Sequence, residues 1–256
     1  MIAALTRLLV NSPLYPHWLE HRKMRQGNDL ILKGIKGQVI EVGAGDGTRK
    51  QEIMNAHPKI KKYLATDFSS WDEEFDRIGA QASRFGRVGE VFMGRQTRLS
   101  LDDVCSATKL PYKPSRFDAH LSFEVLEHID KPLEYFAEAR KVVKKGGQII
   151  FSVPFLYREH KMDYYRYTGD FFDFIAKENN LKLTKLYSNT GFGTTCAVMA
   201  NQWLVRRIME GPLVLRPFLL LIAPIYFCFY NLVGLLIDVR PDTRFATRYH
   251  VVFKKL

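Results

Sequence analysis

Short apolar runs typical of buried β-strands alternate along this chain with segments of helical periodicity. The strands that we expect are 38–42, 62–68, 118–123, 147–154, 181–187 and 248–255. The helices that we expect are 16–32, 48–56 and 133–144, the last with Gly146 as its C-cap. This alternation predicts an α/β fold with a doubly wound, mainly parallel sheet.

Two stretches have a weaker pattern. Residues 1–10 fit a short amphipathic helix, which lacks the basic region and cleavage site of a signal peptide. Residues 69–100 are acidic at first and then basic with scattered glycines, and we expect a helix followed by a loop.

Glycines stand at alternate positions directly after the first predicted strand. Gly43, Gly45 and Gly47 let the backbone approach a ligand closely, because no Cβ intervenes. A dinucleotide site would place a glycine at position 48, where this chain has Thr48, and the carboxylate of Glu41 would repel a pyrophosphate. The pattern therefore favours a ligand with a cationic amine and disfavours a dehydrogenase. The alternative is a glycine-rich structural turn.

The run from Glu41 to Thr48 resembles motif I of class I S-adenosylmethionine (SAM)-dependent methyltransferases, E/D-x-G-x-G-x-G. The resemblance implies a seven-stranded Rossmann-like sheet with SAM as the methyl donor. It also implies that Asp67, at the end of the second strand, binds the ribose hydroxyls. The cofactor-binding residues that it implies in this part of the chain are Glu41, Gly43, Ala44, Gly45, Asp67 and Phe68.

Later blocks extend the resemblance over roughly residues 35–195. The segment 104–123 resembles the family's D-A-x-x-L-P-F…F-D-x-V block, with Ser106 at the position of the acid that contacts adenine. A hydrogen bond from Ser106, a backbone contact from Ala107 and a contact from Phe123 are implied. The following residues 124–129 (EVLEHI) resemble the family's E-V-x-E-H motif.

The segment 154–168 follows the fifth strand and resembles an H-x-x-D-x-x-R-Y-T element of methyltransferases from bacterial surface-glycan and small-molecule pathways. Ligands of open α/β sheets lie beyond the carboxyl ends of the strands, so this segment is expected to face the acceptor. We expect His160 to be the general base, Asp163 to orient it and His128 to be a second candidate base. The side chains expected to bind the acceptor are Tyr157, Tyr164 and Arg166. Alternatively, Asp163 and Arg166 form an ion pair that only fixes the loop, and His128 only fixes the start of a helix.

The net charge indicates which partners to expect, and the cysteine pattern indicates the cell compartment. Lys and Arg number 38 and Asp and Glu number 27, a formal net charge of +11, which favours an anionic surface or substrate. Cys105, Cys196 and Cys228 are scattered, so we expect no disulfide framework and no metal site, as in a cytoplasmic protein. A nucleic-acid substrate is disfavoured, because the chain has no motif for a flipped base.

Residues 217–237 contain 21 residues without a charge, enough to cross a membrane. Pro224 predicts two short apolar segments joined by a bend, and basic residues lie on both sides of the run. We therefore expect residues 198–239 to attach the chain to the inner face of a membrane without crossing it, as a re-entrant hairpin or an interfacial helix pair. The alternatives are packing against the soluble domain and a homodimer interface.

These patterns define the expected organisation and function. We expect N-terminal helices over 1–34 that cover the cofactor or touch the membrane, and a SAM-binding core over 35–197. A hydrophobic helical insertion over 198–246 then precedes a closing strand over 247–256. The expected activity is methyl transfer to an oxygen of a small or lipid-linked acceptor, such as a glycan precursor or quinone. The alternatives are a carbon or nitrogen acceptor and a non-catalytic SAM-fold membrane scaffold.

Overall fold

The computed structural model describes residues 8–45, 47–68, 101–159 and 162–256. The chain divides into two compact units. The first, which we call the helical unit, comprises Met1–Ile31, Pro154–Lys161 and Tyr187–His250. The second, the sheet unit, comprises Leu32–Val153, Met162–Leu186 and Val251–Leu256.

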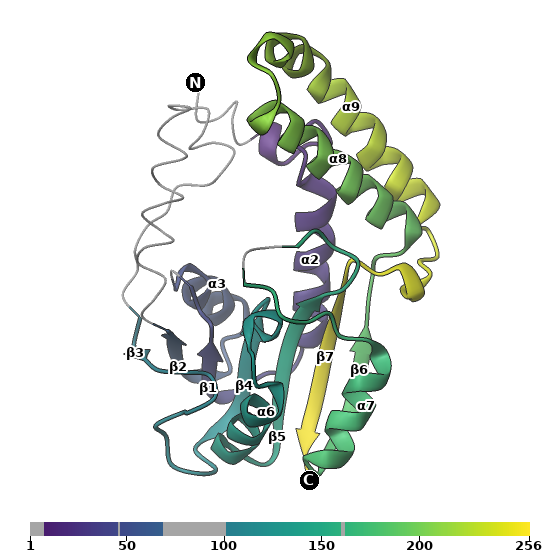
Figure 1. The fold of residues 1–256 in the computed structure, drawn as a ribbon. Coiled ribbons are helices and arrows are strands. Elements are labelled where there is room, and N and C mark those ends of the chain that lie inside the picture. Colours follow the sequence, from purple (N-terminus) through teal and green to yellow (C-terminus); the bar gives the residue numbers. More distant parts are fainter. Residues whose placement is uncertain (1–7, 46, 69–100, 160–161) are drawn as a thin grey trace. The chain divides into compact units, whose positions relative to one another are not determined.

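Seven strands form one sheet in the order β3-β2-β1-β4-β5-β7-β6 (Figure 1). Neighbouring strands from β3 to β5 run parallel, with Glu41 opposite both Ala65 and Leu121. The strands are β1 (Gly37–Val42), β2 (Ile60–Asp67), β3 (Asp103–Val104), β4 (Phe117–Phe123), β5 (Val143–Pro154), β6 (Leu181–Tyr187) and β7 (Arg248–Lys255). The predicted seven-stranded Rossmann-like sheet is confirmed, including its sixth strand at the expected residues.

Strand β7 runs antiparallel to its neighbour β5. At one end, Lys255 near the end of β7 donates through Nζ to the carbonyl oxygen of Val143, the first residue of β5, at 2.7 Å. At the other end, the amide of Phe155 donates to the carbonyl oxygen of Thr247 at 2.8 Å. The parallel sheet therefore gains one reversed strand between β5 and β6.

The helical segments in the described part of the sheet unit are α3 (Thr48–Ala56), η1 (Leu126–His128), α6 (Pro132–Val142) and α7 (Gly169–Glu178). Phe136 of α6 lies with its ring centroid 5.6 Å from that of Phe151 in β5 and 5.9 Å from that of Phe253 in β7. Phe172 of α7 packs on Phe151 at 5.7 Å. All four rings are fully buried, so α6 and α7 are fixed to adjacent strands by one aromatic core.

The end of α6 differs from the prediction. Gly146 was expected to cap the helix, but α6 ends at Val142 and Val143 already has the extended backbone of β5. Val143 is β-branched, fully buried and paired with Phe117, so the strand prevails over the helix there. Gly146 lies inside β5 with φ 77°, beside an irregular step in the β4–β5 register.

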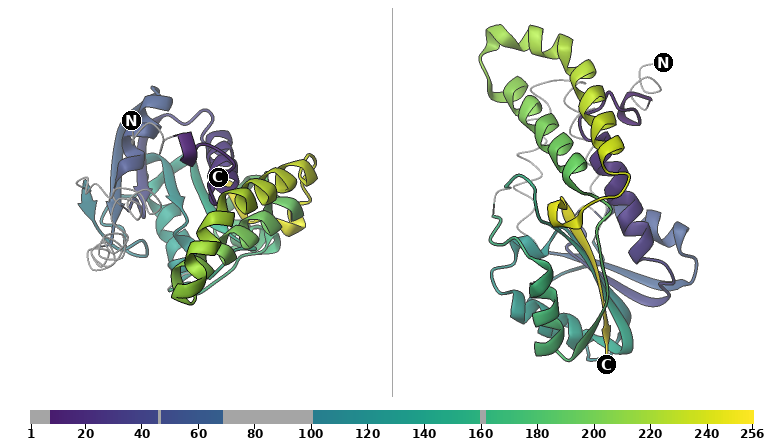
Figure 2. Two further views of the ribbon diagram at one scale, coloured as in Figure 1. Left: turned by 90° about the horizontal axis from the view of Figure 1, so that it is seen from above. Right: turned by 90° about the vertical axis from the view of Figure 1, so that its right-hand side faces the viewer.

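The helical unit contains α2 (Trp18–Ile31), α8 (Phe192–Glu210), η2 (Leu213–Leu215), α9 (Arg216–Ile237) and η3 (Thr243–Phe245). Helices α8 and α9 form an antiparallel pair, which we call the hairpin (Figure 2). The predicted bend at Pro224 is wrong, because α9 continues through it for 22 residues. A proline removes one backbone donor, and the packing of α9 along α8 keeps the helix whole. The chain turns instead at Gly211 and Pro212.

The two helices of the hairpin approach each other closely at their base. A Cβ on Gly234 would lie 2.8 Å from the carbonyl oxygen of Gly193 and 2.8 Å from the Cβ of Ala197. Beside this crossing, the Asp238 carboxylate accepts backbone N–H groups from Gly191, Gly193 and Thr194 at 2.8, 3.0 and 2.8 Å. A carboxylate at the end of α9 thus caps the N-terminus of α8.

Candidate active site

Glu41 lies fully buried near the end of β1 and is held by two side chains of the sheet unit. Tyr63 of β2 donates through its hydroxyl to Glu41 Oε2 at 2.8 Å, and Arg49 Nε lies 3.7 Å from Glu41 Oε1. Burial and then the Glu41 charge raise the pKa of Tyr63, so the phenol remains a donor. The carboxylate therefore has a fixed direction beside the glycine turn.

The glycine turn joins β1 to α3 through residues with positive φ. At Gly43, with φ 77°, an added Cβ would lie 2.1 Å from Val125, so only glycine fits. The amides of Gly43 and Ala44 both donate to the carbonyl oxygen of Thr66, at 2.9 and 3.0 Å. Gly45 has φ 59°, and among the described residues no heavy atom would lie within 4 Å of a Cβ there. The open side of Gly45 provides the space into which a ligand could approach the backbone.

Asp67 ends β2 with only 6% of its surface exposed. Its Oδ2 accepts the Gly45 amide at 2.6 Å and its Oδ1 accepts the Phe68 amide at 2.6 Å. A carboxylate oxygen can accept more than one hydrogen bond, so these contacts orient Asp67 without excluding ribose hydroxyls. Phe68 follows with 53% of its surface exposed. The residues around the β1 and β2 tips therefore fit the SAM-binding pattern that the sequence predicts.

Ser106 and Ala107 lie in the loop after β3. The Ser106 hydroxyl is 2.9 Å from Thr108 Oγ1 and accepts the Thr108 amide at 3.3 Å. Its contact with adenine stays a prediction. Asp103 is not among the predicted site residues; it pairs with Thr66 in the β2–β3 register and accepts the Tyr112 hydroxyl at 2.8 Å. The sequence shows two consecutive acidic residues, Asp102 and Asp103, before this loop, and that pair is the pattern from which Asp103 could have been predicted.

The motif after β4 places two glutamates close together. Glu124 adopts φ 57° and accepts the Ser152 hydroxyl at 2.7 Å, and its amide donates to the Ser152 carbonyl oxygen. Glu127 is 2% exposed, and burial and then the Glu124 charge raise the pKa of Glu127 well above its usual value. Burial and the charge of Glu124 therefore favour the protonated form of Glu127. The motif resemblance implies no separate role for Glu124 or Glu127, although their three-residue spacing is visible in the sequence.

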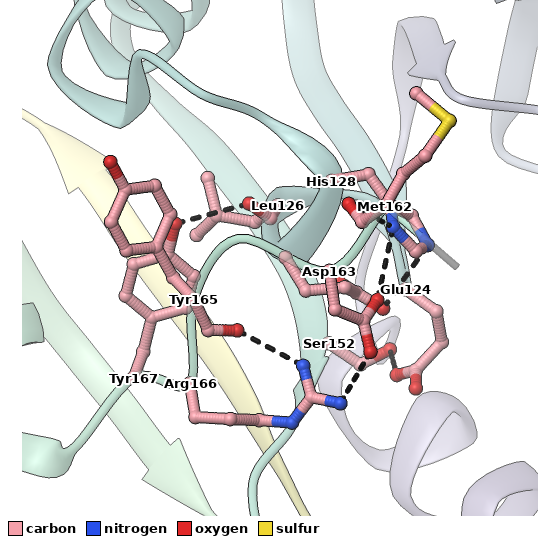
Figure 3. Close-up of polar contacts among 10 residues, drawn as sticks. Glu124, Leu126, His128, Ser152, Met162, Asp163, Tyr165, Arg166 and Tyr167 are labelled. Atoms are coloured by element: carbon pink, nitrogen blue, oxygen red, sulfur yellow. Dashed lines mark hydrogen bonds and ion pairs between the residues drawn. The ribbon is translucent and has the colours of Figure 1, made fainter. Parts of the chain in front are cut away.

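The side chains of His128 and Asp163 lie in contact, although the two residues are far apart in the sequence. His128 Nδ1 lies 3.1 Å from Asp163 Oδ1 and 3.2 Å from the Met162 carbonyl oxygen (Figure 3). Arg166 Nη2 binds Asp163 Oδ2 at 2.5 Å, and the Asp163 side chain is only 3% exposed. If Nδ1 donates to the Met162 carbonyl oxygen, Nε2 is the basic nitrogen of His128, and the Asp163 carboxylate lies beside Nδ1 as a negative charge. The predicted orientation of His160 by Asp163 stays a prediction, because His160 lies outside the described residues.

Hydrogen bonds fix the segment 163–167 to the turn after β4. The amide of Tyr164 donates to the carbonyl oxygen of Glu127 at 2.8 Å. The Tyr167 hydroxyl donates to the carbonyl oxygen of Leu126 at 3.1 Å (Figure 3). Arg166 also donates through Nη1 to the Tyr165 carbonyl oxygen at 3.0 Å. The Tyr164 side chain is exposed. This part of the predicted acceptor segment therefore has a defined position in the sheet unit.

Tyr157, also predicted to bind the acceptor, belongs to the helical unit. The guanidinium carbon of Arg248 lies 5.9 Å from the centroid of its ring, and Arg248 Nη2 donates to Glu20 Oε1 at 3.0 Å. Burial and then the charge of Glu20 raise the pKa of Tyr157. In the structure, Tyr157 is therefore part of a buried ion-pair cluster, and its role toward an acceptor stays a prediction.

A family model described as a methyltransferase domain matches residues 15–197 of this chain. The chain belongs to this methyltransferase family. A curated relative, a demethylmenaquinone methyltransferase of Renibacterium salmoninarum, is 28% identical over 125 residues. That match covers 47% of this chain and 44% of the relative, so the chain matches less than half of the relative's length.

Solved methyltransferase structures share the fold at low sequence identity. A chain from the complex between the Haloferax volcanii Trm112 methyltransferase activator and a putative methyltransferase has a TM-score of 0.53 and 14% identity, covering 93% of this chain and 92% of that chain. A SAM-dependent methyltransferase from Mesorhizobium loti has a TM-score of 0.50 and 14% identity, covering 94% and 98%. The predicted class I SAM-dependent methyltransferase is thereby confirmed at the level of the family and its fold.

Proposed function

We propose that this methyltransferase uses SAM to methylate an oxygen of a small or lipid-linked acceptor. The observation that carries the proposal is the His128–Asp163 pair at 3.1 Å, directly after β4. Strands β1 and β4 are parallel neighbours, so the ends of both lie at one edge of the sheet. Glu41 and the glycine turn lie at that edge too, and ligands of open α/β sheets bind there.

The proposed contacts with the cofactor lie at this edge of the sheet. Glu41 would face the methionine amine, the backbone from Gly43 to Gly45 would lie under the cofactor, and Asp67 would accept the ribose hydroxyls. Ser106, the Ala107 backbone, Phe68 and Phe123 would line the adenine side. Bound SAM supplies an electrophilic methyl group on its sulfonium. The buried, fixed carboxylates and the open side of Gly45 support this assignment.

The acceptor hydroxyl must lose its proton as its oxygen takes the methyl group. We assign that proton to His128 Nε2, because a hydrogen bond to the Met162 carbonyl oxygen and the nearby negative charge of Asp163 favour the tautomer with Nδ1–H and a basic Nε2. The resulting imidazolium would be stabilised by the Asp163 carboxylate. Arg166 holds the other oxygen of Asp163 and would also attract an anionic group of the acceptor. His160 is the alternative base.

The proposed class of methyl acceptor is supported by the curated relative and not by the geometry of the site. The curated relative is named for demethylmenaquinone, which favours a quinone-type acceptor and keeps open the alternative of a carbon or nitrogen acceptor. The other class of function is a scaffold that keeps the fold without catalysis. A scaffold need not bind SAM, whereas an enzyme must bind it and release S-adenosylhomocysteine.

The function is tested with the purified full-length chain, methyl-labelled SAM and a lipid and quinone extract of the source cells. We expect label to enter one component of the extract, and mass spectrometry to find that component heavier by one methylene group. The position of the label on oxygen, carbon or nitrogen decides between the acceptor classes. Absence of SAM binding, together with absence of label transfer, would refute the enzyme and leave the scaffold.

A further inference from the structure

The outward face of α9 carries an uninterrupted apolar stripe. Its members recur every three or four residues along the helix and are between 42% and 77% exposed: Phe218, Leu221, Ile225, Phe229, Leu232 and Leu236. The residues buried on the opposite side of α9 are Ala223, Phe227, Asn231 and Gly234. Only 22% of the most apolar 18-residue window within 213–237 is buried, so this helix is not an ordinary core helix.

The second helix and the turn are apolar on the outside as well. Exposed positions on α8 recur at the same spacing: Phe192, Cys196, Met199 and Trp203. The turn between the helices exposes Leu213 (74%), Val214 (83%) and Leu215 (49%). The hairpin therefore presents apolar side chains from both helices and from its turn.

Polar groups of the hairpin lie between the helices. Asn201 of α8 donates to Asn231 Oδ1 of α9 at 2.9 Å, and Asn231 donates to the carbonyl oxygens of Pro13 and Tyr15 at 2.8 and 3.0 Å. Asn201 and Asn231 are both fully buried. A hairpin exposed to water normally has the reverse arrangement, whereas hydrogen-bonded polar groups inside and apolar groups outside are typical of helices in lipid.

Charged residues gather at the ends of this apolar surface. Arg207 lies before the turn, Arg216 follows it and Arg240 comes after α9. Arg206 and Arg244 are ion-paired with Glu210 and Asp242, at 2.7 and 2.6 Å. Arg216 binds the carbonyl oxygen of Met209 at 2.9 Å, and no charged residue interrupts the sequence from 217 to 237. Basic residues beside an apolar helix pair complement the negative surface of anionic lipids.

We propose that the α8–α9 hairpin docks the protein into the cytoplasmic face of an anionic bilayer without crossing it. The uncharged part of α8, 192–205, is about 21 Å long at 1.5 Å per residue, shorter than a hydrocarbon core of about 30 Å. A crossing would also carry Arg206, Arg207 and Arg216 to the far side, against the positive-inside tendency. A second copy of the chain would cover one face, whereas the apolar residues occupy both helices and the turn. A lipid surface can cover them together.

Vesicle flotation tests the proposal with the full-length chain. The probe is phosphatidylcholine vesicles that contain phosphatidylglycerol, and the expected result is flotation with the vesicles that persists in high salt. Replacing Leu221 and Ile225 by glutamate (Leu221→Glu with Ile225→Glu) should weaken the partition by about 100-fold or more, because each buried aliphatic side chain contributes roughly tenfold. Both side chains are at least 75% exposed, so the fold should persist, as circular dichroism would show.

The matched control replaces Leu133 and Phe174 by glutamate (Leu133→Glu with Phe174→Glu). These side chains on α6 and α7 are 53% and 48% exposed, so the same two charges are introduced away from the hairpin. The control should float like the original protein. Equal loss in both variants, complete release by salt, or no flotation would overturn the proposal. A detergent-free dimer that dissociates on Leu221→Glu would instead assign the stripe to a second copy.

Discussion

At the scale of single residues, the Asp67 carboxylate both orders the turn and offers acceptors to a ligand, because it already holds the Gly45 and Phe68 amides. We predict that Asp67→Ala weakens SAM binding by about 10- to 100-fold, since a hydrogen bond to a charged group is worth about 1.5–3 kcal/mol. Isothermal titration calorimetry measures the change. The exposed acid Asp173 on α7 provides the control in Asp173→Ala. Unchanged affinity in a folded Asp67→Ala protein would contradict the cofactor placement.

His128 provides a second prediction at this scale. His128→Gln should lower kcat with the true acceptor by about 10²- to 10⁴-fold, the usual effect of losing a general base. SAM affinity should stay the same, because the change is on the acceptor side. His160→Gln should stay within about threefold of the original kcat if His128 is the base, and His57→Gln, between α3 and β2, serves as the remote control. Full activity in His128→Gln would return the role to His160.

At the scale of elements, the close approach of α8 and α9 at Gly234 leads to a specific prediction about stability. A glycine-to-alanine change inside a helix normally stabilises it by up to about 1 kcal/mol. Gly234→Ala should do the opposite and cost about 1–3 kcal/mol, because the new Cβ meets a backbone oxygen of α8 at 2.8 Å. Urea unfolding measures the difference.

The matching control for that crossing is Gly169→Ala at the start of α7. The nearest atom to its new Cβ would be a Leu186 carbon at 3.4 Å, an ordinary contact. It should be neutral or slightly stabilising. Similar stability changes for the two alanines would mean that the crossing does not limit how closely α8 and α9 pack.

Local sequence patterns predicted those strands and strand ends that depend on neighbouring residues in the sequence. The strand at 181–187 and the acid at the tip of β2 follow from apolar runs and their ends. Interactions distant in sequence decided the rest. Val143 belongs to the buried strand β5 and not to helix α6. Pro224 lies inside the continuous helix α9, which packs along α8. The His128–Asp163 contact joins segments 35 positions apart through a loop fold that no periodicity encodes.

At the scale of the whole molecule, each unit buries a neutral histidine. Burial lowers the pKa of His120, in the sheet unit, to about 4 and that of His250, in the helical unit, to about 3. Both values lie below the ordinary value of 6.5, so below that pH the unfolded chain binds more protons than the folded one. Stability is therefore fully present above about pH 6.5 and is lost as pH falls toward 4.

We predict that His120 alone costs about 2 kcal/mol of stability when the pH falls from neutral to about 5. His120→Phe, which keeps a ring against Tyr135, should remove that part of the pH dependence. Urea midpoints of both proteins at the two pH values measure it. The half-buried His57, which lies outside the buried core, provides His57→Phe as the control. An unchanged slope in His120→Phe would show that this histidine does not titrate as described.

The position of β7 between β5 and β6 has a consequence for how the protein is made. A ribosome produces β5, β6 and the whole hairpin before the residues of β7 exist. Until then β5 and β6 lack their shared neighbour, and their open edges can pair with other chains. The nascent hairpin, already synthesised and apolar outside, can meet lipid first. If the hairpin docks on a bilayer as proposed, membrane association would precede closure of the sheet, and synthesis without membranes would favour aggregation over folding.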